Sequence, residues 1–149
     1  MFRKIEHIGI AVKDLESANN MFTQMAEIGL LKMETVESEG VKVSFFQVGE
    51  TKIEFLQATS PESPIAKFIE KNGEGIHHIA FDVENVSEEM EKLKEKGFRM
   101  INEKPKKGAD NKIIAFLHPQ STHRVLVELC QENLSSISAS APDDLNAPE

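Results

Sequence analysis

Two histidine-containing segments of this chain share one sequence pattern. The first is Glu6-His7-Ile8-Gly9-Ile10-Ala11-Val12, and the second is Gly75-Ile76-His77-His78-Ile79-Ala80-Phe81-Asp82-Val83. His78 aligns with His7, and Val83 aligns with Val12. Both segments alternate apolar residues with others and are dominated by β-branched or aromatic types, which predicts strands. The repeat therefore indicates a duplicated half, and the fold must be one that two similar units can build.

The residues after the first copy predict a helix and then three strands. Asp14 is a plausible N-cap for a helix over 15–27, because Leu15, Ala18, Phe22 and Met25 fall at helical spacing. Gly29 is expected to end this helix. Strands are predicted at 30–37 (an edge strand), 41–47 and 51–57. With the strand over 4–12, the first half is β-α-β-β-β.

A connector over 58–75 precedes the second half. Ser63 is a good N-cap there, and Pro64 occupies the first helical position. The pattern then restarts with a strand at 76–83, a helix capped by Asn85 and ended by Gly97, a short strand at 98–103, a polar loop at 104–111, and strands at 113–117 and 125–130. The second half is again β-α-β-β-β.

The chain of 149 residues is expected to hold one α+β domain over residues 1–131. Its halves are about 4–57 and 76–131, joined by the connector helix. Residues 132–149 have little to bury, so we expect a disordered tail there.

Charge and composition exclude several classes of function. The net charge of −8 indicates no nucleic-acid surface, although the loop with Lys104, Lys106 and Lys107 is compatible with a small anionic ligand. No apolar run approaches the roughly 20 residues that span a bilayer. The lone Cys130 rules out an internal disulfide and fits a reducing compartment, which predicts a cytoplasmic protein.

Each half also carries one histidine and one glutamate at matched positions. Glu54 follows His7 by 47 residues, and Glu128 follows His78 by 50 residues. Each glutamate interrupts an apolar strand, where a carboxylate facing the interior is costly unless it is paired or coordinated. If the halves pack around a pseudo-twofold axis, these four side chains converge. Two imidazoles and two carboxylates suit a divalent ion such as Co, Ni, Mn, Fe or Zn.

Taken singly, these residues have simpler interpretations. A strand histidine is more often a structural residue than a ligand, and a strand glutamate usually lies on the solvated face. The matched repeat of both favours a site. His77 is expected to face away from His78, because neighbouring strand residues point to opposite faces, and we interpret it as structural or as a support to the ligands. His118 is either structural or at the lip of the cavity, and His123 is expected to be exposed.

The repeat and its His/Glu positions resemble the vicinal oxygen chelate superfamily over residues 4–131, and within it most closely the methylmalonyl-CoA epimerase family. The segments that carry the resemblance are His7-Ile-Gly-Ile-Ala-Val, Gly49-Glu-Thr-Lys-Ile-Glu-Phe-Leu, Ser60-Pro-Glu-Ser-Pro-Ile-Ala-Lys-Phe-Ile, Gly73-Glu-Gly-Ile-His-His-Ile-Ala-Phe-Asp-Val, Ala115-Phe-Leu-His-Pro and Val125-Leu-Val-Glu-Leu. The resemblance implies two tandem βαβββ modules that form a cupped, barrel-like sheet around a metal ion, cobalt first among the candidates. It implies the ligand set His7, Glu54, His78 and Glu128, a CoA thioester as the bound small molecule, and a homodimer.

The activity implied by the resemblance is epimerisation of (2R)- and (2S)-methylmalonyl-CoA by 1,1-proton transfer through an enediolate, with Glu128 and Glu54 as proton carriers. The chain departs from the family pattern at Gln120, His123 and Arg124, where the family has lysine and two glycines, and it has no glutamate at Val43 or Ser44. These differences bear on ligand specificity.

Two alternatives stay open. One is a glyoxalase I-type lactoylglutathione lyase, which uses the same His-Glu-His-Glu set. The other is a non-catalytic binding protein of the superfamily, which the full ligand set argues against. An extradiol dioxygenase normally has two histidines and one carboxylate, so Glu54 argues against that activity.

Overall fold

The computed structural model describes residues 1–134. Its strands form one eight-stranded sheet in the order β2-β3-β4-β1-β5-β8-β7-β6. The two halves join where β1 (Lys4–Ala11) pairs antiparallel with β5 (Gly75–Asp82). In each half the first strand runs parallel to the last, β1 with β4 (Thr51–Ala58) and β5 with β8 (Val127–Glu132). The mirrored order is that of two related units about a pseudo-twofold axis, which confirms the predicted α+β class.

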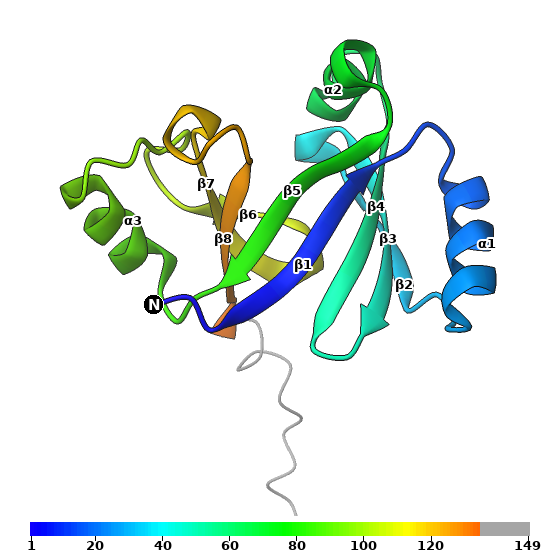
Figure 1. Ribbon diagram of the computed structural model, residues 1–149, viewed down its shortest axis with the longest axis horizontal. Helices are drawn as coiled ribbons and strands as arrows, with labels where there is room; N and C mark the ends of the chain where they lie inside the picture. Colours follow the sequence, from blue (N-terminus) through cyan, green and yellow to red (C-terminus); the bar gives the residue numbers. More distant parts are fainter. Residues whose placement is uncertain (135–149) are drawn as a thin grey trace, which may run out of the picture.

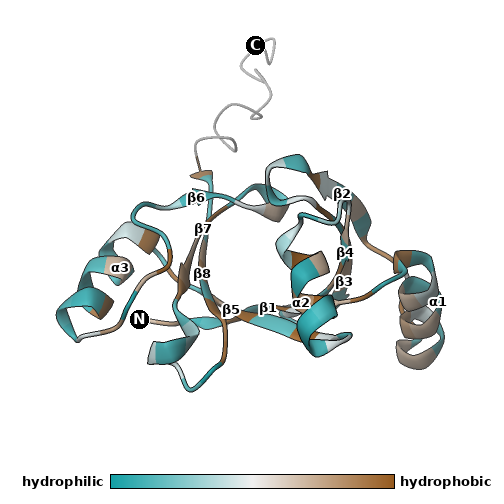
Figure 2. Cartoon of the chain, turned by 90° about the horizontal axis from the view of Figure 1, so that it is seen from above, coloured by the Kyte–Doolittle hydropathy of each residue, from teal (hydrophilic) through white to brown (hydrophobic). Residues whose placement is uncertain are grey.

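The sheet is strongly curled (Figures 1 and 2). Seen from above, β1 and β5 lie on one side, and the two edge strands of the sheet lie opposite them (Figure 2). The remaining strands are β2 (Lys32–Val36), β3 (Val41–Val48), β6 (Lys106–Lys107) and β7 (Lys112–Leu117), and the helices are α1 (Leu15–Ala26), α2 (Pro64–Asn72) and α3 (Val86–Glu95). Short 3-10 turns follow at Glu37–Glu39 (η1), Ala109–Asn111 (η2) and Pro119–Ser121 (η3).

Each half has its own apolar core between a helix and the outside of the sheet. In the first half, Phe22 of α1 packs edge-to-face on Phe46 and Phe55. In the second half, Val86 and Met90 of α3 pack against strands β7 and β8. The predicted caps of two helices are confirmed, since Ser63 accepts a hydrogen bond from the backbone of Ile65, and Asn85 from that of Glu88. The inner face of the sheet is thereby left to a different set of side chains.

Two local predictions were wrong. Helix α1 ends at Ala26 rather than at Gly29, because Glu27 adopts a left-handed conformation (φ 56°) and its N–H bonds to Thr23. Asp14 occupies the N-cap position of α1, as predicted, but its side chain makes no cap hydrogen bond. Residues 98–103 form only an isolated bridge, between Met100 and Leu117. The side chain of Asn102 accepts a hydrogen bond from the backbone N–H of Phe116, which ends the strand pairing there.

The second strand of the second module lies instead at β6, inside the segment that was predicted to be a polar loop. The predicted tail falls outside the described residues except for its first three positions, and β8 extends to Glu132. Among the described helices, none has both the length and the apolar character needed to cross a bilayer.

Candidate metal centre

The four residues singled out in the sequence lie on the four central strands of the sheet. His7 is on β1, Glu54 on β4, His78 on β5 and Glu128 on β8. Each of these residues is buried, with no more than 6% of its surface exposed to solvent. Small residues separate them in register. Gly9 pairs with both Glu54 and His78, and Ala80 pairs with both His7 and Glu128. The inner face of the sheet thus presents two rows, Glu54–Gly9–His78 and His7–Ala80–Glu128.

Three of the four side chains meet at one point. The Nε2 atom of His7 lies 3.0 Å from Nε2 of His78 and 3.0 Å from Oε2 of Glu128. The donor atoms of these three residues all lie within 4.8 Å of one another. Glu54 approaches the other edge of the same ring, with its Oε2 atom 3.0 Å from Nδ1 of His7. His7 therefore lies between the two carboxylates.

The donor set fits a divalent cation. Two ligands about 2.1 Å from an octahedral ion and cis to each other lie about 3.0 Å apart, which is the spacing of Nε2 of His7 from both Nε2 of His78 and Oε2 of Glu128. Oε2 of Glu128 is buried and receives no well-directed hydrogen bond. A buried oxygen in that state is costly, and a bound cation is one partner that satisfies it.

Electrostatics distinguish the two imidazoles. Burial lowers the pKa of His78 to about 3. Burial also acts to lower the pKa of His7, but the carboxylates of Glu128 and Glu54 outweigh it and hold that pKa well above its usual value. Burial raises the pKa of Glu54, although His7 opposes the shift. Without a metal ion, a protonated His7 supplies the positive charge between the carboxylates.

Sequence reasoning missed Glu6 as a residue of the site, and it gave the wrong orientation for His77, which it interpreted as structural or as a support to the ligands. The pairing of β1 with β5 shifts between Ile5 and His7 and again between Gly9 and Ile10, which leaves Glu6 and His77 without register partners. Such bulges break the alternation of side chains along a strand. The prediction that His77 faces away from His78 was wrong for this reason, since its Nδ1 atom lies 2.9 Å from Nδ1 of His78. No signal in the alternating pattern marks these positions.

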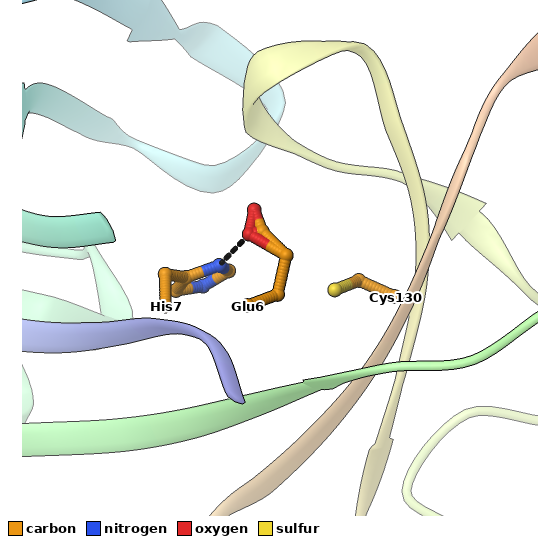
Figure 3. A group of neighbouring side chains, drawn as sticks. All are labelled: Glu6, His7 and Cys130. Atoms are coloured by element: carbon orange, nitrogen blue, oxygen red, sulfur yellow. Dashed lines mark hydrogen bonds and ion pairs between the residues drawn. The ribbon is translucent and has the colours of Figure 1, made fainter. Parts of the chain in front are cut away.

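Glu6 is buried beside His7 and belongs to an ion network whose other members are partly exposed. Its Oε2 atom is 3.4 Å from Nδ1 of His7 (Figure 3), and its Oε1 atom is 3.0 Å from the ammonium of Lys52. Lys52 in turn pairs with Asp110 of η2 at 3.0 Å, and Asp110 also contacts Lys32 of β2. These charges tie the segment between β6 and β7 to the opposite edge of the curled sheet.

Cys130 completes a second group of potential ligands with Glu6 and His7 (Figure 3). Its thiol contacts the carbonyl of Phe81 at 3.6 Å, and burial raises its pKa far above the ordinary value, helped by nearby carboxylates. A thiol binds metal as a thiolate. Since Lys52 holds Glu6 and the thiol stays protonated, this group is a structural neighbour of the site.

A cavity of about 90 Å³ opens over the four central residues. Apolar side chains from both halves line it, together with the ionisable residues Glu39, His77 and Lys112. On β3, Val43 lines the cavity, whereas Ser44 does not. At the rim, the ammonium of Lys106 pairs with Glu39 at 2.6 Å. This ion pair links the second half of the molecule to the first. His118 accepts a hydrogen bond from the backbone of Gln120 and does not line this cavity. His123 is exposed, as predicted.

Comparison with known proteins identifies relatives along most of the chain. Residues 6–116 match the Glyoxalase/Bleomycin resistance protein/Dioxygenase superfamily. The chain is 42% identical to an ethylmalonyl-CoA/methylmalonyl-CoA epimerase of Cereibacter sphaeroides, covering 88% of this chain and 99% of the relative. It is 40% identical to the uncharacterized protein YqjC of Bacillus subtilis, covering 86% and 91%.

Solved structures agree with these matches. A methylmalonyl-CoA epimerase in complex with methylmalonyl-CoA superposes with a TM-score of 0.86 at 31% identity, over 89% of this chain and 96% of that one. The similar fold and the similar sequence together indicate that the chain and these proteins share a common ancestor. The chain belongs to the glyoxalase/bleomycin resistance protein/dioxygenase superfamily and, within it, to the family of the methylmalonyl-CoA epimerases.

Proposed function

We propose that this protein interconverts (2R)- and (2S)-methylmalonyl-CoA by a metal-dependent 1,1-proton transfer. The observation that carries the proposal is the placement of two carboxylates, Glu54 and Glu128, on opposite sides of His7 at the floor of one cavity. Inversion at a carbon atom needs a proton carrier on each face, and the pseudo-twofold axis supplies one from each half. The names of the relatives provide the substrate class.

The residues that would hold the ion are His7, Glu54, His78 and Glu128. Cobalt is the first candidate, and Ni, Mn, Zn and Fe are compatible with the same nitrogen and oxygen donors. When bound, a divalent ion supplies a Lewis acid that lowers the cost of negative charge beside the thioester carbonyl. Glu54 reaches this point from the Nδ1 side of His7, so it is the outermost member of the set.

The protein groups then account for the proton. One carboxylate takes the α-proton from one face of the substrate, and the opposing carboxyl group returns a proton to the other face. We assign the proton transfer on one face to Glu128 and that on the other face to Glu54. Burial keeps water from competing, and it raises the pKa of the Glu54 carboxyl toward that of a useful base. No atom other than the proton is exchanged, so the reaction balances without a further reactant.

The partners follow from the surface. The CoA portion of the substrate must leave the cavity at its rim, where Lys106 pairs with Glu39, and we propose that the segment with Lys104, Lys106 and Lys107 offers positive charge to it. We also propose a homodimer, because the outer face of β1 and β5 carries the apolar pairs Ile5–Phe81, Ile8–Ile79 and Ile10–Ile76, none fully buried. The lone buried cysteine fits a cytoplasmic protein.

The deciding experiment starts from one epimer of methylmalonyl-CoA in deuterated buffer, with metal-free protein and with added cobalt. We expect racemisation and incorporation of deuterium at the α-carbon only when the ion is present. Cobalt-loaded protein that exchanges no deuterium would refute the proposal. Parallel incubation with methylglyoxal and glutathione tests the glyoxalase I alternative, for which we expect no product.

A further inference from the structure

His77 enters the cavity because β5 carries one extra residue at this point. β1 pairs Gly9 with His78 and Ile10 with Ile76, so His77 has no partner across the strand. Its side chain lies on the same side as that of His78 and lines the same cavity. The ring of His77 packs edge-on against Phe68 of α2, with centroids 4.9 Å apart. Its position is therefore fixed by packing.

The contact between the two rings constrains where their protons lie. Nδ1 of His77 and Nδ1 of His78 are 2.9 Å apart, and a hydrogen bond between them needs one donor and one acceptor. If His77 donates, neutral His78 must carry its own proton on Nε2, the atom that faces His7. If His78 donates, its Nε2 keeps a free lone pair at the centre of the site.

We propose that His77 is a positioning residue, which accepts a hydrogen bond from the Nδ1–H group of His78 and so fixes the tautomer whose Nε2 atom binds the divalent ion. The inference rests on the proposed function, because it takes His78 as a ligand. Partners of this kind orient metal-binding histidines and raise their basicity.

The first half of the molecule uses the same arrangement. Glu6 precedes His7 as His77 precedes His78, occupies the corresponding bulge, and contacts Nδ1 of its neighbouring histidine at 3.4 Å. In both halves the residue before the histidine meets the ring nitrogen that points away from Nε2. Two pseudo-equivalent contacts indicate that the bulges serve the histidines.

The test uses two substitutions that differ in their ability to accept. His77→Leu removes the acceptor but keeps an apolar side chain against Phe68. His77→Asn places an amide oxygen near the former position of Nδ1. We expect His77→Leu to weaken cobalt binding about 10- to 100-fold, and His77→Asn to stay within about threefold of the parent protein. His123→Leu, in an exposed turn, is the matched control and should bind cobalt like the parent.

Affinity is measured by competition with a chromophoric chelator, after thermal unfolding has shown that each metal-free variant is folded. In ¹⁵N-labelled metal-free protein, the NMR spectrum reports which nitrogen carries the shared proton, and we expect Nδ1 of His78. A proton on Nδ1 of His77, unchanged affinity in His77→Leu, or an equal loss in His77→Asn overturns the inference. Parent protein that binds no cobalt overturns the proposed metal site instead, and the spectrum still locates the proton.

Discussion

The strands β1 and β5 carry the same irregularity next to their histidines but fill it with opposite chemistry. Glu6 is a buried carboxylate. Burial acts to raise its pKa, but His7 and Lys52 outweigh burial and bring the pKa to about 2. His77 packs on Phe68, and burial lowers its pKa, so it stays neutral. One half supports its histidine with an ionised group, and the other half with a neutral ring.

The difference indicates how the duplicated halves diverged. The backbone bulge and the histidine occur in both, whereas the supporting residue changed. Glu6 belongs to an ion network that includes Lys52 and Asp110 and reaches the far edge of the sheet. His77 contacts the neighbouring rings of His78 and Phe68 and, among the described residues, belongs to no such network. Changes to the network of Glu6 are therefore expected to affect the stability of the fold, and changes to His77 are expected to affect the binding of the ion.

The largest effect is expected at Glu128. Glu128→Gln removes the proposed proton carrier and one ligand charge while it keeps the size of the side chain. We expect the turnover of methylmalonyl-CoA to fall by at least about 10³-fold, measured as deuterium incorporation at the α-carbon. Glu132→Gln, at the exposed end of the same strand, should leave the rate unchanged. A Glu128→Gln protein within tenfold of the parent rate would remove Glu128 from the mechanism.

Gly9 and Ala80 give the next comparison, since each separates two site residues. A Cβ atom on Gly9 would lie 2.6 Å from Nδ1 and 2.7 Å from Nε2 of His78, so Gly9→Ala must displace that ring. Ala80 faces His7 and already carries a Cβ atom. We expect Gly9→Ala to weaken cobalt binding about 100-fold, in the range for a misplaced ligand. Ala80→Gly should cost only about 1 kcal/mol of folding free energy.

Both effects are measurable by metal titration and thermal unfolding of the same samples. If Gly9→Ala binds cobalt like the parent, the ring of His78 is not held where the structure places it.

Much of this fold could be predicted from the sequence, because the repeat of two His-containing strands sets the order of the elements. The pairs His7/Glu54 and His78/Glu128 stood out for the same reason. The bulges could not be predicted, since Glu6 and His77 fit the alternating pattern as well as any residue. Strand β6 was missed as well, because two lysines in a polar loop carry no strand signal, and they form a strand only by pairing with β7.

Lys52 tests the ionic half of the comparison. Lys52→Met leaves the carboxylate of Glu6 buried beside His7 without its ammonium partner. We expect a loss of about 3 kcal/mol in the free energy of unfolding, as for a broken buried ion pair, measured by urea denaturation of metal-free protein. The double variant Glu6→Gln/Lys52→Met should recover part of this loss, because the unpaired charge is gone. Lys42→Met, exposed on β3, is the control.

If the double variant is no more stable than Lys52→Met alone, the stabilisation does not come from the ion pair with Glu6.

Metal binding should also compete with protons at His7. Because the two carboxylates raise the pKa of His7, the metal-free protein holds a proton there at neutral pH, and that proton must leave when the ion binds. Apparent cobalt affinity is expected to rise about tenfold per pH unit until the pH passes the raised pKa. The same proton stabilises the metal-free fold at low pH, and this contribution is lost as the pH rises through that pKa.

The dependence of cobalt affinity on pH also distinguishes His77 from His7. His77→Leu should lower the affinity at every pH without changing the slope, because His77 releases no proton. Titrations between pH 6 and pH 8 measure both quantities, and a pH-independent affinity in the parent protein would contradict the protonated state of His7.

The smallest effect on cobalt binding is expected at Glu54, although it is the pseudo-equivalent of Glu128. Its Oε2 atom meets Nδ1 of His7 rather than Nε2, so it lies outside the group formed by His7, His78 and Glu128. In Glu54→Gln an amide oxygen can still accept from Nδ1–H and can still coordinate an ion. We expect cobalt affinity to fall less than tenfold, about 1.4 kcal/mol, whereas turnover falls strongly because an amide cannot carry the proton. A loss of cobalt affinity as large as that of Gly9→Ala would show that Glu54 holds the ion as firmly as His78 and that the asymmetry of the metal-free site does not persist in the metal-bound protein.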